Sequence, residues 1–284
     1  MEVSAPARAT GEAGKRPTRG VGNPPTGGSG SSARDGGLPA LVGHRGAAAV
    51  EPENTVVSFR RAVAEGVQLL ECDVHLSSDG ADAVIHDATL DRTAQEDSPL
   101  RTGAVADLTR AQLDRVLVGS GQHIPTLTEV LDAAVRTEGS RVPLLVEIKA
   151  PGAAERVVRL LVEYFDEDVW DAPSPPAQII SFHPEALRTA READPRIPLL
   201  LTTTTTSPEF FETAEDLGVA QIGVRIADAR QVDVERTRAL GIQLNLWTAR
   251  SEEELARALE LGCDTLTVDD PAWAFSLMAE PAQT

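Results

Sequence analysis

Apolar residues gather in nine short runs along the chain, and these runs alternate with longer segments of helical periodicity. The runs lie at residues 40–45, 67–76, 83–86, 143–149, 177–182, 197–202, 220–226, 242–247 and 264–268. Apolar positions recur every three or four residues in the segments 55–66, 126–139, 153–165, 184–194, 232–241 and 251–262. Continuous apolar strands that alternate with amphipathic helices predict a parallel sheet covered by helices.

Nine predicted strands are one too many for an eight-stranded barrel. Only the segment SSDGAD, residues 77–82, joins the second strand to the third, and it contains the Asp-Gly pair of a tight turn. Since a parallel crossover needs a longer connection, we expect a hairpin that brings His86 opposite Glu71 or Asp73. The sequence therefore predicts an α/β fold, a TIM-type (β/α)8 barrel with a short β-hairpin excursion after the second strand.

Composition divides the chain into a tail and one large domain. Residues 1–38 are rich in Gly, Pro, Ser and Ala and contain no aromatic residue, so we expect a disordered N-terminal tail. Residues 39–284 have about the length that one barrel of this type requires, roughly 250 residues. We expect them to form a single barrel domain.

The absence of long apolar runs and the acidic charge narrow the classes of function. No stretch has the apolar length of a secretory signal or a membrane span, so we expect a cytoplasmic protein without an integral membrane segment. Cys72 and Cys263 lie in apolar stretches and are expected to be buried free thiols.

A net charge of −18 should repel nucleic acid and anionic lipid headgroups. An anionic substrate would therefore need a local cationic site, and Lys149 is the only lysine after the tail.

Three carboxylates stand at positions where a barrel enzyme carries its chemistry. Glu71 and Asp73 are two residues apart on one strand, so their side chains point to the same face and Cys72 points to the other. Glu147 comes near the end of another apolar strand. Converging carboxylates predict a site for Mg²⁺ or Ca²⁺, because both ions prefer oxygen ligands. Ordinary ion pairs with arginines of the barrel are the alternative.

Two histidines accompany these carboxylates. His44 ends the first predicted strand and His86 ends the hairpin, so both should stand at the mouth of the barrel. Two imidazoles can divide the work of a general base and a general acid near neutral pH. Arg45 and Lys149 would supply the positive charge that a phosphodiester requires. The remaining histidines lack such neighbours, and we expect them to be structural or loop residues: His75, His123 and His183.

Several short motifs occur together and in a fixed order. They are GHRG at 43–46, PENT at 52–55, ECDV at 71–74, HDATLDRT at 86–93, IPTLTEVL at 124–131, EIK at 147–149, SFHPEALR at 181–188 and WTAR at 247–250. Together they resemble the bacterial glycerophosphodiester phosphodiesterases, from about residue 40 to about residue 275. The resemblance implies a TIM-type barrel that cleaves glycerophosphodiesters into glycerol 3-phosphate and an alcohol.

The resemblance also implies roles for single residues. Acid/base catalysis would fall to His44 and His86, metal binding to Glu71, Asp73 and Glu147, and phosphate binding to Arg45 and Lys149. Glu53 and Asn54 of PENT would support the site, with Glu53 directed toward Arg45 or the metal and Asn54 toward a histidine. Trp247 would form a wall of the glycerol pocket. Water and the glycerol 2-hydroxyl both remain possible as the attacking group.

Some of these residues also have purely structural interpretations. PENT followed by VVSFRRA is a good helix start, because Pro, Glu and Asn favour entry into a helix. Trp247 could be an ordinary core tryptophan. Two positions depart from the family pattern, since Arg250 replaces the usual Asn and Val268 the usual Thr of TDxP. Both are expected to lie away from the metal and the histidines, and so to affect recognition of the glycerol or the leaving group.

Two other functions are compatible with the motifs. One is a related lysophospholipase D-like phosphodiesterase, which the acidic surface and the lack of an amphipathic anchor disfavour. The other is a noncatalytic barrel that binds phosphodiesters, which would not need both an acid and a base. We expect a small-molecule glycerophosphodiester as the partner and no nucleic acid. The sequence leaves the oligomeric state open.

Overall fold

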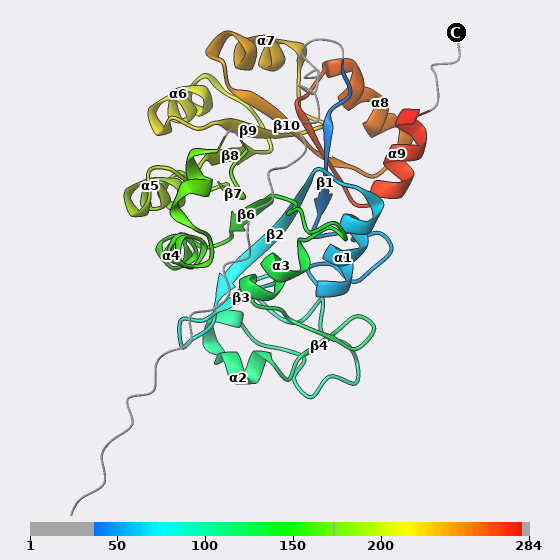
Figure 1. Ribbon diagram of the computed structural model, residues 1–284, viewed down its shortest axis with the longest axis vertical. Helices are drawn as coiled ribbons and strands as arrows, with labels where there is room; N and C mark the ends of the chain where they lie inside the picture. Colours follow the sequence, from blue (N-terminus) through cyan, green and yellow to red (C-terminus); the bar gives the residue numbers. More distant parts are fainter. Residues whose placement is uncertain (1–36, 173, 280–284) are drawn as a thin grey trace, which may run out of the picture.

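Eight parallel strands close into a barrel. The computed structural model describes residues 37–172 and 174–279 (Figure 1). The barrel strands are β1 (Ala40–His44), β2 (Leu69–Leu76), β6 (Leu144–Ile148), β7 (Ala177–Ser181), β8 (Leu199–Thr203), β9 (Gln221–Arg225), β10 (Gln243–Ala249) and β11 (Thr265–Val268). Each strand pairs with the next in this order, and β1 pairs with both β2 and β11. The predicted TIM-type barrel is confirmed. The predicted tail lies, except for its last two residues, outside the described residues and stays a prediction.

Helices surround this barrel (Figure 1). They are α1 (Val56–Glu65), α3 (Leu127–Ala133), α4 (Ala154–Tyr164), α5 (Pro184–Ala193), α6 (Pro208–Leu217), α7 (Gln231–Leu240), α8 (Glu252–Leu261) and α9 (Pro271–Ala279). Short 3₁₀ turns at Pro151–Ala153 and Glu167–Asp171 flank α4. The hydroxyl of Thr55 caps α1 and Gly66 ends it in the left-handed conformation. Helices α6 and α9 were not predicted from the sequence.

The predicted hairpin is present, but the excursion that it begins is longer than expected. Strand β3 (Asp82–Val84) pairs antiparallel with β2, with Val74 opposite Val84. The chain then forms a 3₁₀ turn (Val105–Asp107), α2 (Arg110–Leu113), β4 (Leu117–Val118) and β5 (Gln122–His123). These elements have a small apolar core of their own, made by Ala83, Ile85, Leu90, Val105, Leu113, Val116, Val118 and Ile124. The excursion lies beside the barrel, at the bottom of Figure 1.

The register of this hairpin differs by one residue from the prediction for His86. Pairing stops at Val84, and the last bridging hydrogen bond runs from Ile85 N to Asp73 O over 3.0 Å. Continued through two more pairs, the register would set Cys72 opposite His86. The chain instead turns away after Ile85, so His86 comes to the barrel mouth from a loop.

Side chains of the barrel strands alternate between two environments. Cys72 lies in the core between the strands and the helices, together with Phe59 and Leu70. Inside the barrel, Val42, Leu145, Ile180 and Leu200 form an apolar layer. The opposite wall carries a buried polar network in which Gln221 and Asn245 each donate to Thr265 Oγ1 over 2.8 Å. The interior is thus packed, and the chemistry is confined to the strand ends.

Two further expectations concern thiols and membranes. Both cysteines are buried and unpaired, as predicted. Within residues 37–172 and 174–279, no helix combines the length and the apolar character needed to cross a bilayer.

Candidate active site

The C-terminal ends of three neighbouring strands assemble the first part of the site. In the parallel register, His44 of β1 pairs with Glu71 of β2, and Asp73 of β2 pairs with Glu147 of β6. The carboxylates of Glu71, Asp73 and Glu147 each offer an oxygen within 4.8 Å of the others. The structure therefore brings together the three carboxylates that the sequence analysis singled out.

Burial makes this carboxylate cluster electrostatically costly. Glu71 and Asp73 are only 4% and 1% exposed. Burial, followed by the charges of Asp73 and Glu147, raises the pKa of Glu71 well above its usual value. Burial and the neighbouring Asp73 likewise raise the pKa of Glu147 to about 7. Without a further cation, the ionised forms of Glu71 and Glu147 are thus disfavoured at this point of the barrel mouth.

Arg45 and Lys149 offset part of this charge. Arg45 donates its backbone N–H to Glu71 Oε2 over 2.9 Å, and its Nε lies 3.2 Å from Asp73 Oδ2. Lys149 Nζ lies 2.8 Å from Glu147 Oε1 and 3.3 Å from Asp73 Oδ1. Burial works to raise the pKa of Asp73, but Lys149 and Arg45 together lower it. Two cations face three carboxyl groups, so Arg45 and Lys149 alone cannot neutralise the cluster with all three groups ionised.

The donor set fits a hard divalent cation. Glu71 Oε1 is a buried oxygen that accepts no hydrogen bond from any described residue, and Asp73 Oδ1 accepts none either, with the Lys149 ammonium 3.3 Å away. Buried polar atoms are nearly always partnered, so the unpartnered Glu71 Oε1 fits the coordination of a cation. Carboxylate oxygens in this number and proximity are typical ligands of Mg²⁺ or Ca²⁺. Glu71, Asp73 and Glu147 could therefore hold such an ion.

His44 is held by an aspartate from the last barrel strand. Its Nδ1 lies 2.5 Å from Oδ1 of Asp269, directly after β11, and Arg250 Nε donates to Asp269 Oδ2 over 2.5 Å. The side chain of His44 is 13% exposed. Burial lowers the pKa of His44, although its hydrogen bond to Asp269 opposes the shift. The imidazole is therefore neutral near pH 7.

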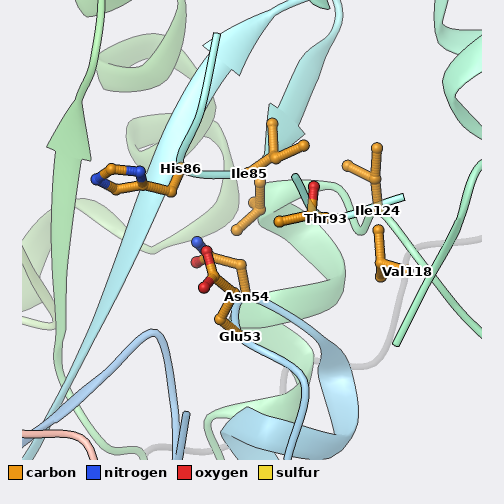
Figure 2. Close-up of a pocket in the computed structure, with 8 residues that line it drawn as sticks. Glu53, Asn54, Ile85, His86, Thr93, Val118 and Ile124 are labelled. Atoms are coloured by element: carbon orange, nitrogen blue, oxygen red, sulfur yellow. The ribbon is translucent and has the colours of Figure 1, made fainter. Parts of the chain in front are cut away.

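His86 has a similar pair of neighbours but is more exposed. Its Nδ1 lies 2.6 Å from Asp87 Oδ1, and Arg92 Nε donates to Asp87 Oδ2 over 2.6 Å. The hydrogen bond from Arg92 is the main reason why the pKa of Asp87 is lowered. The ring of His86 points away from Ile85 and Ile124, which line the apolar side of the small cavity in Figure 2. His75, expected to be structural, bonds the backbone carbonyl of His86 through Nε2 over 3.1 Å.

Glu53 and Asn54 connect these groups from the loop before α1 (Figure 2). Glu53 accepts from Arg45 Nη1 over 2.9 Å and from both terminal nitrogens of Arg92. Asn54 donates to Asp73 Oδ2 over 2.8 Å, so its partner is a carboxylate and not the expected histidine. Thr55, the next residue, provides the helix cap. PENT thus starts the helix and also reaches the site.

Trp247 lies in β10 and Arg250 follows that strand directly; β11 alone separates β10 from β1. Trp247 is half-buried at the end of β10, and its ring packs edge-on against Phe182 with centroids 5.5 Å apart. Its indole N–H has no hydrogen-bond partner among the described residues. Arg250 and Val268 were expected to lie away from the histidines, which is wrong: Arg250 contacts Asp269, and Val268 pairs with Gly43 next to His44.

Three residues that were not predicted contact the imidazoles directly or through one carboxylate: Asp87, Arg92 and Asp269. A signal for Asp269 existed, because it directly follows a strand of the barrel at the C-terminal end. Asp87 and Arg92 both lie within the HDATLDRT motif. Their contacts depend on how the loop folds back, which a linear pattern does not reveal.

Comparisons with known proteins agree on one group of enzymes. The model of the "Glycerophosphoryl diester phosphodiesterase family" matches residues 44–273. A glycerophosphodiester phosphodiesterase of Caldanaerobacter subterraneus subsp. tengcongensis is 29% identical over 252 residues, which cover 84% of this chain and 97% of the relative. A probable glycerophosphodiester phosphodiesterase 1 of Mycobacterium tuberculosis is 29% identical over 244 residues, or 80% of this chain and 87% of the relative.

A solved structure extends this likeness to three dimensions. An Oleispira antarctica phosphodiesterase in complex with the product sn-glycerol-3-phosphate superposes with a TM-score of 0.75 at 25% identity. The superposition covers 88% of this chain and 100% of that one.

Proposed function

The chain belongs to the glycerophosphoryl diester phosphodiesterase family, and we propose that it hydrolyses glycerophosphodiesters to glycerol 3-phosphate and an alcohol in a reaction that depends on a divalent metal. The relatives named above are phosphodiesterases of this kind, and the product complex of one of them contains glycerol 3-phosphate. The supporting observation in this chain is the cluster of Glu71, Asp73 and Glu147 between two histidines at one end of the barrel.

Positive charge in this cluster supports binding of the phosphodiester. Arg45 and Lys149 lie within 3.3 Å of the carboxylates and would face the nonbridging oxygens of a bound phosphate. Mg²⁺ or Ca²⁺ held by the three carboxylates would add a Lewis acid at the same place. Glu53 would hold Arg45 in position, and Asn54 would orient Asp73. Trp247 would form a wall against the glycerol.

The two imidazoles would divide the proton transfers. His44 fits the general base, since burial lowers the pKa of its imidazole and leaves it neutral near pH 7. It would take the proton from the attacking oxygen as the bond to phosphorus forms. His86, which is more exposed, would give a proton to the departing alkoxide as the bond between phosphorus and the alcohol oxygen breaks.

The attacking oxygen belongs to water or to the glycerol 2-hydroxyl, which would form a cyclic phosphate first. A substrate analogue without that hydroxyl, 3-hydroxypropyl phosphocholine, separates the two routes. Release of choline from the analogue at a rate close to that of glycerophosphocholine would support direct attack by water. An inert analogue that still competes with glycerophosphocholine would support the cyclic route.

Turnover with and without metal tests the proposed function. Glycerophosphocholine and glycerophosphoethanolamine are incubated with the protein and Mg²⁺ or Ca²⁺, and glycerol 3-phosphate is measured. We expect release that a chelator abolishes, and we expect the metal to raise the melting temperature, because a ligand that binds only the folded state stabilises it. Glu71→Gln should lose both effects. A folded protein that binds the diester without cleaving it would favour the noncatalytic interpretation.

The cellular location is a separate proposal. We propose the cytoplasm, where free thiols such as those of Cys72 and Cys263 persist. Fractionation of cells that express the protein would measure this, and recovery in a membrane or extracellular fraction would contradict it.

A further inference from the structure

Two aspartate–arginine pairs flank the histidines at the barrel mouth, and the pair beside His44 includes Arg250, a departure from the family pattern. Asp269 Oδ1 lies 2.5 Å from His44 Nδ1, and Asp269 Oδ2 accepts from Arg250 Nε over 2.5 Å. One carboxylate thus spans the imidazole and the guanidinium. We propose that Asp269 is a positioning residue that fixes His44 in the tautomer with its proton on Nδ1, and that Arg250 fixes the orientation of Asp269.

The choice of tautomer follows from the chemistry of the partners. An ionised carboxylate only accepts hydrogen bonds, so the nitrogen that faces Asp269 must carry the proton. The lone pair of a neutral His44 then lies on Nε2. Among the residues that the structure describes, none hydrogen-bonds Nε2 of His44. That nitrogen is therefore free to take a proton from the attacking oxygen of the proposed reaction.

Burial gives this contact more weight than an ordinary surface pair. The side chains of His44 and Asp269 are 13% and 19% exposed, whereas those of His86 and Asp87 are 32% and 28% exposed. Shielded from water, the His44 ring has few alternative partners for Nδ1. Arg250 is 56% exposed and reaches Asp269 from the solvent side. Because a guanidinium only donates, it requires an acceptor oxygen at the Oδ2 position.

The need of Arg250 for an acceptor oxygen makes Asp269→Asn a sharp test. The donor of Arg250 would draw the amide oxygen toward itself, so the amide nitrogen would face His44. An amide N–H at this point requires a lone pair on Nδ1, which moves the proton of the imidazole to Nε2. Changing Arg250 to Ala in the same protein removes this constraint and lets the amide turn. The two substitutions should therefore interact, and a double-mutant cycle measures the interaction.

Asp270 provides the matched control. It is the next residue in the chain, and its carboxylate accepts from Trp273 N over 2.9 Å at the start of α9. Asp270→Asn makes the same chemical change without touching His44. A loss of activity from general loosening of this segment would occur in both variants.

The experiment combines two readouts. Nitrogen-15 correlation spectra give the tautomer of the His44 ring, with His44→Gln to assign its signals, and steady-state kinetics on glycerophosphocholine give kcat and KM. We expect Asp269→Asn to move the proton to Nε2 and to lower kcat by up to about 10⁴-fold, the loss seen when a buried aspartate that orients a catalytic histidine is replaced by asparagine. We expect KM to change by less than about threefold, since the contact acts on the reacting proton and not on substrate binding. Asp270→Asn should keep the tautomer and kcat.

Arg250→Ala alone should lower kcat by about two- to fivefold, as suits an exposed ion pair. In the Asp269→Asn background, the same change should raise kcat. An additive loss there would overturn the role of Arg250, and an unchanged tautomer with near-normal kcat in Asp269→Asn would overturn that of Asp269. The kinetic part rests on the proposed function. If the unmodified protein shows no turnover, that function fails while the spectra still decide the tautomer.

Discussion

Histidines at the barrel mouth differ from the other histidines of the chain in their neighbours. His44 and His86 each bond an aspartate through Nδ1, while His123 is exposed in β5 and forms no such pair. An imidazole fixed at one nitrogen presents the other to a substrate in a defined direction. Substitutions of His44 and His86 are therefore expected to affect turnover, and a substitution of His123 is not.

Changing His44 or His86 to Ala should lower kcat by about 10²- to 10⁴-fold, because each change removes a group that transfers a proton. The melting temperature should stay within a few degrees, since neither ring is part of the apolar core. His123→Ala is the control and should keep full activity. Near-full activity in either His44→Ala or His86→Ala would refute the two-histidine mechanism.

The turn GHRG shows how a short element positions several groups at once. Gly46 has φ of +87°, and Arg45 has φ of +55°. A Cβ on Gly46 would lie 2.7 Å from the backbone nitrogen of Phe59 at the start of α1. Only glycine therefore allows this close approach of turn and helix, and the approach places His44 and Arg45 beside the carboxylates.

Gly46→Ala should therefore lower the free energy of unfolding by about 2–4 kcal/mol, because it adds a steric clash to an unfavourable φ. Its kcat should fall as well, since the clash displaces the turn. Gly66→Ala is the control, with φ of +92° and no atom within 4 Å of the added Cβ. That change should cost only about 1 kcal/mol and leave kcat intact. Equal losses in both variants would show that packing against α1 contributes nothing. Urea unfolding measures both.

An ion pair lies in the turn between α5 and β8. Asp194 accepts from Arg196 Nε over 3.0 Å and from Arg196 Nη2 over 2.6 Å. The hydrogen bond from the Arg196 side chain lowers the pKa of Asp194 below its usual 3.8. A carboxyl group with a lowered pKa in the folded state stabilises the protein above the pKa of the unfolded chain. That contribution disappears as the pH falls through the folded pKa.

Asp194→Asn should accordingly lower the free energy of unfolding by about 1–2 kcal/mol at pH 7. The difference from the unmodified protein should shrink as the pH is lowered below about 4, where the unfolded carboxyl group becomes protonated. Asp216→Asn, on the exposed side of α6, is the control and should change stability by less than about 0.5 kcal/mol. Urea unfolding at several pH values gives these numbers. A difference that stays constant down to pH 2 would argue against the ion pair.

The strands were easier to predict than the contacts between side chains of the site. The nine predicted strands are apolar runs because they are buried in the structure, so their burial can be read from the sequence. Helix α9 was missed because its residues, PAWAFSLMA, are apolar on nearly every side and show no stripe. The excursion was underestimated, since the short elements in residues 85–125 gain their order from packing against one another.

Within the site, the difference between what was and was not predictable is one of distance along the chain. Glu71 and Asp73 reveal themselves by their spacing on one strand, whereas the contact of His44 with Asp269 joins residues 225 apart. Asn54 was placed near the correct group of residues but beside the wrong one, because the partner of an amide depends on local turns. Family motifs identify such residues without giving their contacts.

At the scale of the whole molecule, the two thiols report on the integrity of the barrel. Cys72 lies in strand β2, and Cys263 lies two residues before β11. Both side chains are 0% exposed. Burial raises the pKa of Cys263 to about 12 and also raises that of Cys72. Only a thiolate in contact with solvent reacts readily, so both conditions are unmet in the folded protein.

A thiol reagent should therefore leave both cysteines unlabelled in the native protein at pH 8. Labelling should appear only with unfolding, at a rate that follows the global free energy of unfolding as urea is added. A variant with Ala256→Cys on the exposed face of α8 is the control and should be labelled at once. Rapid labelling of Cys263 without urea would mean that the pairing of β11 with its neighbouring strands opens in the native protein.

The pairing of β1 with β11 closes the barrel, and it can form only after the last strand has been synthesised. His44 leaves the ribosome 225 residues before Asp269, a delay on the order of ten to forty-five seconds at about 5–20 residues per second. Throughout this interval β1 lacks one of its two neighbours and presents an open edge to other chains. A nascent chain of this protein would therefore depend on chaperones longest at its earliest strand, and it would gain its chemistry only when the final strand arrives.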